Sequence, residues 1–158
     1  MATLAVNGGT LTVDVGPTET LLDLIRDHME LSGTKRGCEK GDCGVCTVIL
    51  DGEAVCACLV PALQAEGAEV LTIEGLAGTP EIEVYEAAFL AAGAVQCGYC
   101  TPGMVLSVKA LLDRTPQPTR EEIEVAISGN LCRCTGYSQI VEAVELIVGG
   151  GVGQRVGT

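Results

Sequence analysis

The sequence predicts an α+β fold, in which a small mixed sheet over residues 1–76 precedes a domain of four helices over residues 77–150. Two observations lead to this prediction. In the first half, short runs of alternating apolar and polar residues are separated by glycine turns, which is typical of strands. In the second half, apolar residues recur at spacings of three and four, which is the period of an amphipathic helix. The glycine-rich stretch 151–158 predicts a flexible tail.

The elements of the first half follow from local patterns. Residues 3–6 and 10–15 flank the turn signal Asn7-Gly8-Gly9, so they predict a hairpin. The stretch 18–28 carries leucine and isoleucine at helical spacing and predicts a helix across the sheet. The elements expected next are a loop at 33–46, a strand at 47–50, a turn at Asp51-Gly52, a strand at 53–58, a short helix at 60–66 and a strand at 70–73.

Four apolar stripes predict the helices of the second half. Thr119 and Glu122 form a capping box, so a helix with Ile123 on its inner face is expected to begin there. The stretch TPQPT at 115–119 breaks the chain before it. The other three helices are predicted by stripes of apolar residues: Ile82, Tyr85 and Phe89; Met104, Val105, Val108, Leu111 and Leu112; and Ile140, Val141, Val144, Ile147 and Val148.

Composition narrows the class of function. The net charge is -12, from 9 basic and 21 acidic side chains, which argues against nucleic-acid binding and favours a solubilising acidic surface. The start MATLAVNGGT lacks the features of a signal peptide, and no apolar run is long enough for a membrane span. The chain is therefore expected in the cytoplasm, where thiols stay reduced. Its 9 cysteines are accordingly expected to be metal ligands or redox groups.

The first cysteine set has a diagnostic spacing. Cys38, Cys43 and Cys46 read C-x4-C-x2-C, and Cys58 follows after eleven intervening residues. This is the plant-type [2Fe–2S] pattern. In the strand expected there, Cys56 and Cys58 face the same side, so either thiol could be the fourth ligand. A zinc site is the alternative, but zinc sites usually come as paired CxxC knuckles.

The loop around this set suits a buried anion. Four thiolates leave a [2Fe–2S] cluster with net negative charge, which needs hydrogen-bond donors when it is buried. Gly37, Gly41 and Gly44 let the chain curl with its N–H groups pointing inward. Three cations add positive charge nearby: Lys35, Arg36 and Lys40.

The second cysteine set consists of two pairs, Cys97-x2-Cys100 and Cys132-x-Cys134. Each pair precedes an expected helix, and Pro102 suits a first helical turn. A helix N-terminus offers free N–H groups and partial positive charge, which lowers the pKa of a thiol and stabilises an anionic cluster. Spacing alone would also suit zinc or a dithiol redox centre at this set.

Three stretches together resemble a known family. They are GCEKGDCGVCTVILDG at 37–52, QCGYCTPGM at 96–104 and GNLCRCTGY at 129–137. They resemble the two-cluster iron–sulfur subunit of the molybdenum hydroxylases, the xanthine dehydrogenase family, which also includes aldehyde oxidoreductases, carbon monoxide dehydrogenases, and nicotinate, quinoline and purine hydroxylases. The resemblance runs from about residue 3 to residue 148. It implies a β-grasp plant-type ferredoxin domain followed by a four-helix domain.

The resemblance also implies the ligands of two [2Fe–2S] clusters. The cluster nearer the flavin and solvent would be held by Cys38, Cys43, Cys46 and Cys58. The cluster nearer the molybdenum cofactor would be held by Cys97, Cys100, Cys132 and Cys134. Gln96 and Cys134 match the family positions that contact the pterin of that cofactor. Cys56, left over, is expected to be a packed thiol.

By the same resemblance, the chain is an electron-transfer subunit. Electrons would pass singly from a molybdopterin-type cofactor on a large partner, through both clusters, to FAD on a medium partner, in a dimer of heterotrimers. Substrate would be oxidised on the large partner. A free-standing two-cluster ferredoxin carrier is the alternative, which fits the acidic surface but not a second, buried cluster. His28 is expected at the surface, and Arg133 could steady a cluster, face a partner or lie in solvent.

Overall fold

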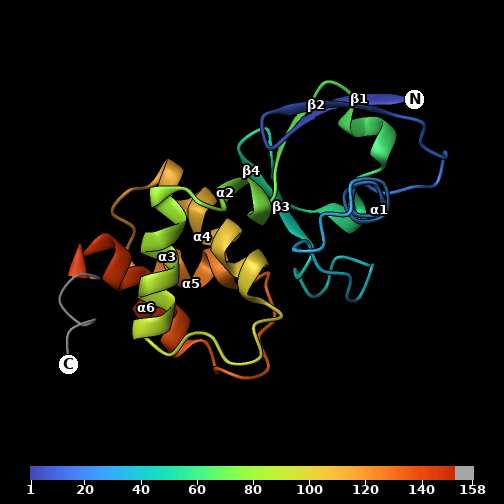
Figure 1. The fold of residues 1–158 in the computed structure, drawn as a ribbon. Helices are drawn as coiled ribbons and strands as arrows, with labels where there is room; N and C mark the ends of the chain where they lie inside the picture. Colours follow the sequence, from blue (N-terminus) through green and yellow to red (C-terminus); the bar gives the residue numbers. More distant parts are fainter. Residues whose placement is uncertain (152–158) are drawn as a thin grey trace.

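The computed structural model describes residues 1–151, so the expected tail 151–158 lies outside the described residues apart from Gly151. Figure 1 shows two lobes side by side, one with the sheet and its helix, the other with the longer helices. The α+β prediction is confirmed. The strands are β1 (Ala2–Val6), β2 (Gly9–Val13), β3 (Thr47–Leu50), β4 (Glu53–Cys56) and β5 (Glu69–Leu71). The helices are α1 (Leu21–Asp23), η1 (Leu24–His28), η2 (Ala57–Leu59), η3 (Ala62–Ala65), α2 (Ile73–Leu76), α3 (Pro80–Ala91), α4 (Thr101–Arg114), α5 (Arg120–Ile127) and α6 (Ser138–Val148).

The five strands form one mixed sheet in the order β2-β1-β5-β3-β4. Strands β1 and β5 are parallel, and the other neighbours are antiparallel. The expected hairpin forms, with Ala2 opposite Val13 and Val6 opposite Gly9. Asn7 and Gly8, with φ of 51° and 80°, adopt the left-handed conformation that a two-residue hairpin turn requires.

The expected helix across the sheet forms as α1 continued by η1. Thr20 and Asp23 make a capping box at its start, which the sequence reading did not single out. Its last turn widens into a π-helix, where Met29 N donates to Leu24 O at 3.2 Å. Its apolar residues share one core with the strands, which completes a β-grasp domain. This core contains Ala2, Leu4, Val6, Leu21, Leu22, Leu24, Ile25, Val48 and Val70.

The four longer helices enclose a second core. Thr79 caps α3, whose first residue is Pro80, and the capping box of Thr119 and Glu122 opens α5 as expected. Helix α3 packs on α6, and α4 packs on α5. Within residues 1–151, no helix combines the length and the apolar character that crossing a bilayer requires. The largest fully buried side chains of this core are Phe89, Met104, Leu106, Ile123 and Ile140.

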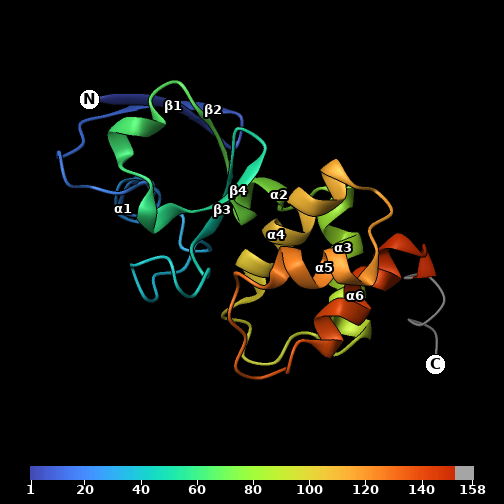
Figure 2. The same cartoon turned by 180° about the vertical axis from the view of Figure 1, so that it is seen from behind.

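Strand β3 belongs to both cores, because successive residues of a strand point to opposite faces. Val48 lies in the core of the sheet domain, and Ile49 lies in the core of the helices. Helix α4 packs on this outer face of β3, and Figure 2 shows α2 and α4 beside β3 from behind. The shared strand therefore brings the loop before β3 close to the start of α4.

Two local expectations are wrong. The expected strand at 53–58 ends at Cys56, since its pairing with β3 stops at Thr47, and the chain turns into η2. Cys56 and Cys58 therefore do not share one face of a strand. The expected strand at 70–73 ends at Leu71, because the Asn7 side chain accepts the Thr72 N–H at 2.9 Å and α2 begins next.

Candidate metal centres

Backbone N–H groups surround the first cysteines of the loop 33–46. Asp42 N donates to Cys38 Sγ at 3.2 Å, and Cys38 N donates to Cys43 Sγ at 3.4 Å. The N–H groups of Lys40 and Cys43 also donate to the Cys38 sulfur. The hydrogen bond from Lys40 N leads these effects and brings the pKa of Cys38 down to about 7, against the opposing effect of burial. The loop thus favours the thiolate form, which is the form that ligates metal.

The four thiols of the first set meet as two pairs. Cys38 is hydrogen-bonded through its side chain to Cys43, and Cys46 to Cys58. Burial raises the pKa of Cys46, and it raises the pKa of Cys58 to about 11, so both thiols favour the protonated form until a metal ion displaces the proton. Cys56 is half-buried and also contacts Cys46. Two pairs of thiols match four thiolates shared between two irons.

Two glycines of the loop adopt the left-handed conformation, and the third is needed only for space. Gly41 and Gly44 have φ of 85° and 66°, as expected for a chain that curls around a site. Gly37 is not left-handed. A Cβ at Gly37 would lie 2.7 Å from Val45 Cγ2 and 2.9 Å from Cys43 Sγ. A glycine is therefore needed at this position because a larger residue would collide with the cysteine side chain.

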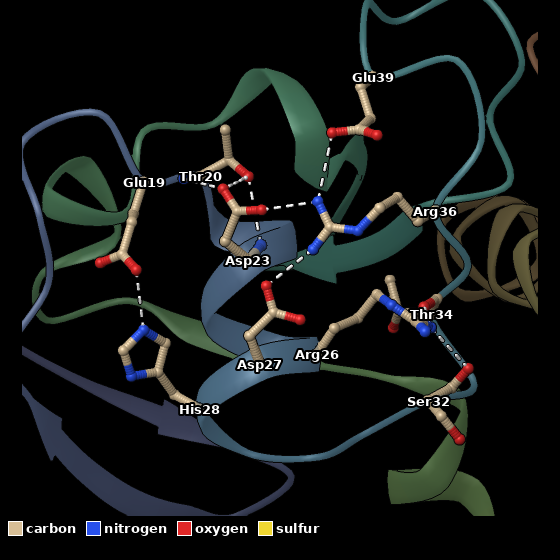
Figure 3. A network of polar contacts seen from close by, with 10 residues as sticks. All are labelled: Glu19, Thr20, Asp23, Arg26, Asp27, His28, Ser32, Thr34, Arg36 and Glu39. Atoms are coloured by element: carbon tan, nitrogen blue, oxygen red, sulfur yellow. Dashed lines mark hydrogen bonds and ion pairs between the residues drawn. The ribbon is translucent and has the colours of Figure 1, made fainter.

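Two of the cations expected beside the first set form ion pairs with carboxylates. Figure 3 shows Arg36 held between Asp23, Asp27 and Glu39, at 2.8, 2.9 and 3.2 Å. Lys40 pairs with Asp42 at 2.9 Å. Carboxylates therefore compensate these charges. Arg36 instead ties the loop to the helix across the sheet. Figure 3 also shows Arg26 donating to the Ser32 carbonyl, and the same nitrogen donates to the Thr34 carbonyl at 2.7 Å.

The second set also meets as two pairs, with one thiol from each segment in each pair. Cys97 is hydrogen-bonded to Cys134, and Cys100 to Cys132. Cys100 is buried and is the N-cap residue of α4, whereas Cys97 and Cys134 are exposed. The helix-entrance expectation holds for Cys100. It is wrong for the other segment, because three residues separate Cys134 from the start of α6.

Tyr137 closes the turn that holds the second segment. It is a non-glycine residue in the left-handed region, with φ of 72°, and its Oη accepts the Cys132 N–H at 2.9 Å. Thr135 Oγ1 lies 3.1 Å from Cys132 Sγ and accepts the Tyr137 N–H. The sequence reading missed both roles, although GNLCRCTGY contains both residues.

Three cysteines of the second set have pKa values shifted in different directions, because burial and hydrogen bonds contribute differently at each thiol. Burial, followed by the hydrogen bond with Cys132, raises the pKa of Cys100 to about 12. The lowering expected at a helix N-terminus is therefore outweighed there. Although burial opposes it, the hydroxyl and N–H of Thr135 hold the pKa of Cys132 below its usual range. The hydrogen bond with Cys97 raises the pKa of Cys134.

The remaining residues singled out lie at the surface. Gln96 is exposed next to Cys97, and Arg133 is exposed between the two cysteines of its segment. His28 is exposed as expected and lies 3.0 Å from Glu19.

The donor sets fit diiron clusters. Among residues 1–151, no three His, Cys, Asp or Glu side chains converge to hold a single metal ion. Each set contains two contacting pairs of thiols, with backbone or hydroxyl donors aimed at sulfur, and Cys56 lies beside Cys46 in the first set. This arrangement suits two irons bridged within one site.

Comparison with known families divides the chain into two matched parts. The 2Fe-2S iron-sulfur cluster binding domain matches residues 4–72, and the [2Fe-2S] binding domain matches residues 72–145.

Individual relatives match nearly the whole chain. The nicotinate dehydrogenase small FeS subunit of Eubacterium barkeri is 50% identical over 145 residues, covering 92% of this chain and 92% of the relative. The nicotine 6-hydroxylase small subunit of Paenarthrobacter nicotinovorans is 47% identical over 152 residues, covering 96% and 91%. A chain of quinoline 2-oxidoreductase from Pseudomonas putida 86 superposes with a TM-score of 0.88 and 39% identity, covering 96% and 94%.

Proposed function

The chain belongs to the two-cluster [2Fe–2S] small subunits of the molybdenum hydroxylases, and from that premise we propose how its residues serve electron transfer. The subunit passes electrons between a molybdenum cofactor and FAD on partner subunits of an oxidoreductase, and the free-standing carrier is not favoured. When bound, [2Fe–2S] clusters supply one-electron transfer with little rearrangement.

Each domain holds one cluster in this proposal. Cys38, Cys43, Cys46 and Cys58 ligate the first, in a domain of residues 1–76. Cys97, Cys100, Cys132 and Cys134 ligate the second, in a domain of residues 77–150. The observation that carries the assignment is the contact between thiols, because it places Cys46 beside Cys58 and joins two distant segments in the second set. Cys56 also contacts Cys46, so the choice of Cys58 as the fourth ligand rests on the plant-type spacing.

The exposed side of the second set is the proposed contact with the large partner. Cys134 and Gln96 are exposed there beside Cys97, so their side chains are available to the pterin of the molybdenum cofactor. The medium FAD subunit is proposed on the side of the first set. We further propose a cytoplasmic dimer of heterotrimers. The names of the relatives, which are subunits of larger enzymes, support only the part of this proposal that places the chain in a multi-subunit complex.

Iron analysis and EPR test the proposal directly. The native complex should carry about four irons and four labile sulfides in this chain, and dithionite should produce two distinct [2Fe–2S] signals. A native complex whose small subunit contains zinc, or a single cluster, would contradict the ligand assignment.

A further inference from the structure

The two cysteine sites meet at a seam of three hydrogen bonds. Tyr99 Oη donates to the Arg36 carbonyl at 2.6 Å, and Leu131 N donates to the Cys43 carbonyl at 2.8 Å. Asn130 Nδ2 donates to the Gly44 carbonyl at 2.9 Å. Every donor comes from a segment of the second set, and every acceptor lies on the loop of the first set. The helical domain therefore holds the first loop by its main-chain carbonyls.

Asn130 is the buried centre of this seam, with 4% of its surface exposed. Besides Gly44, its amide nitrogen donates to Thr47 Oγ1 at 3.1 Å, and its Oδ1 accepts from Ser107 Oγ at 2.8 Å. Thr47 Oγ1 in turn donates to the Gly44 carbonyl at 2.7 Å. One amide thus joins the first loop, β3 and α4, and both of its N–H groups are used.

Two glycines lie in this seam, and a side chain at either position would collide with atoms across it. A Cβ on Gly44 would overlap Gly129 O and lie 2.9 Å from Asn130 Cα. A Cβ on Gly103, in α4, would lie 2.8 Å from Gly44 O and 3.0 Å from Asn130 Nδ2. The backbones approach as closely as the absence of side chains permits.

We propose that Asn130 is a positioning residue for electron exchange between the two sites, because its bond to Gly44 fixes their spacing and relative orientation. Gly44 directly follows Cys43, and Asn130 lies two residues before Cys132, so the bond connects one ligand segment to the other. Electron exchange between two centres falls steeply as their separation grows. A buried, fully paired amide is a rigid connector, because moving it would leave polar groups unsatisfied.

Two substitutions change this connector without touching a proposed ligand. Asn130→Asp keeps the shape but removes both donors, so the carbonyl of Gly44 faces a carboxylate instead of an N–H. Gly103→Ala pushes a methyl group against Gly44 O from the opposite side. Gly129→Ala is the matched control, because it adds the same methyl group beside Asn130 in open space.

The readout is the magnetic interaction between the two reduced clusters in the intact complex, measured by EPR together with iron content. Asn130→Asp and Gly103→Ala should keep the wild-type iron content but change the spin–spin splitting. Gly129→Ala should keep both at wild-type values.

Two results would overturn the inference. One is a wild-type splitting in fully loaded Asn130→Asp or Gly103→Ala. The other is loss of the clusters from both variants but not from Gly129→Ala, which would assign the contact to folding alone. The inference rests on the proposed ligand sets, and the iron content of the wild-type complex tests those sets separately from the splitting.

Discussion

The two sites solve the same ligation problem in different ways. The first is made by one continuous loop with Cys58 added, and Cys46 and Cys58 are buried. The second is assembled from two segments that are 31 residues apart between Cys100 and Cys132, and Cys97 and Cys134 remain exposed. A site closed by its own chain needs curled backbone and inward N–H groups. A site left open on one side can present its ligands to another subunit.

Removing a proposed ligand should have the largest effect and should separate the two sites. Cys58→Ala should lower the iron content to about half of the wild-type value, because one cluster of two loses a ligand. The second-cluster EPR signal should persist, since its thiols lie in the other domain. Cys56→Ala is the matched control and should retain both signals. Loss of the first signal from Cys56→Ala, with retention in Cys58→Ala, would reverse the assignment.

The second largest effect is expected from backbone strain at Gly44, in the loop of the first site. Gly44→Ala should destabilise the protein by roughly 3 kcal/mol, because it combines a left-handed residue with a backbone clash. Gly52→Ala, in an open turn with φ of 86°, is the control and should cost only about 1–2 kcal/mol. Urea unfolding of both variants measures the difference. Equal losses would show that the close approach at Gly44 contributes nothing.

The features that the sequence alone predicts are those that depend on residues close together in the chain. The strand and helix periodicities and the capping box at Thr119 are local, and they predict the elements correctly, although two of the strands end earlier than expected. The two cysteine sets were recognisable for the same reason, since ligand spacing within a segment is a local property. The position of Cys58 in η2 was missed, because it depends on where β3 stops pairing. The Asn130 contacts were missed as well, because their partners are 83 and 86 residues away.

Charge was the least predictable part of the candidate sites. Lys40 and Arg36 were expected to act on a cluster, yet neighbouring carboxylates pair with both. Sequence shows that a cation is near a motif but not which anion it meets, since Asp23 and Asp27 come from the helix across the sheet. Donors to sulfur come mainly from the backbone, whose direction depends on the φ values of the loop.

Replacing Tyr137 should have a smaller effect on stability, and this effect should be confined to the second site. Tyr137→Phe removes the acceptor of the Cys132 N–H, which should cost about 1 kcal/mol of stability. The second cluster should then lose iron to a chelator faster than in the wild-type protein. The first-cluster EPR signal in the same sample is the internal control. Equal acceleration at both clusters would mean that the hydroxyl supports the whole fold instead of this turn.

The smallest expected difference is in how stability depends on pH at the two capping boxes, those of Thr20 with Asp23 and of Thr119 with Glu122. Although burial opposes it, hydrogen bonds from Thr20 and Arg36 hold the pKa of Asp23 below its usual value. Its contribution to stability is therefore complete above the ordinary carboxyl pKa and is lost as pH falls through the lowered one. Asp23→Asn should cost about 1 kcal/mol near pH 7, and this cost should shrink as the pH falls below the ordinary carboxyl pKa.

The exposed box at Thr119 is the comparison for this last test. Its hydrogen bonds also lower the pKa of Glu122, but no arginine joins them, so Glu122→Gln should change the pH profile less. Urea midpoints measured across this pH range give both profiles. Equal pH dependence in the two variants would show that Arg36 adds nothing to Asp23. The ion-pair network would then have no share in holding the first loop against its helix.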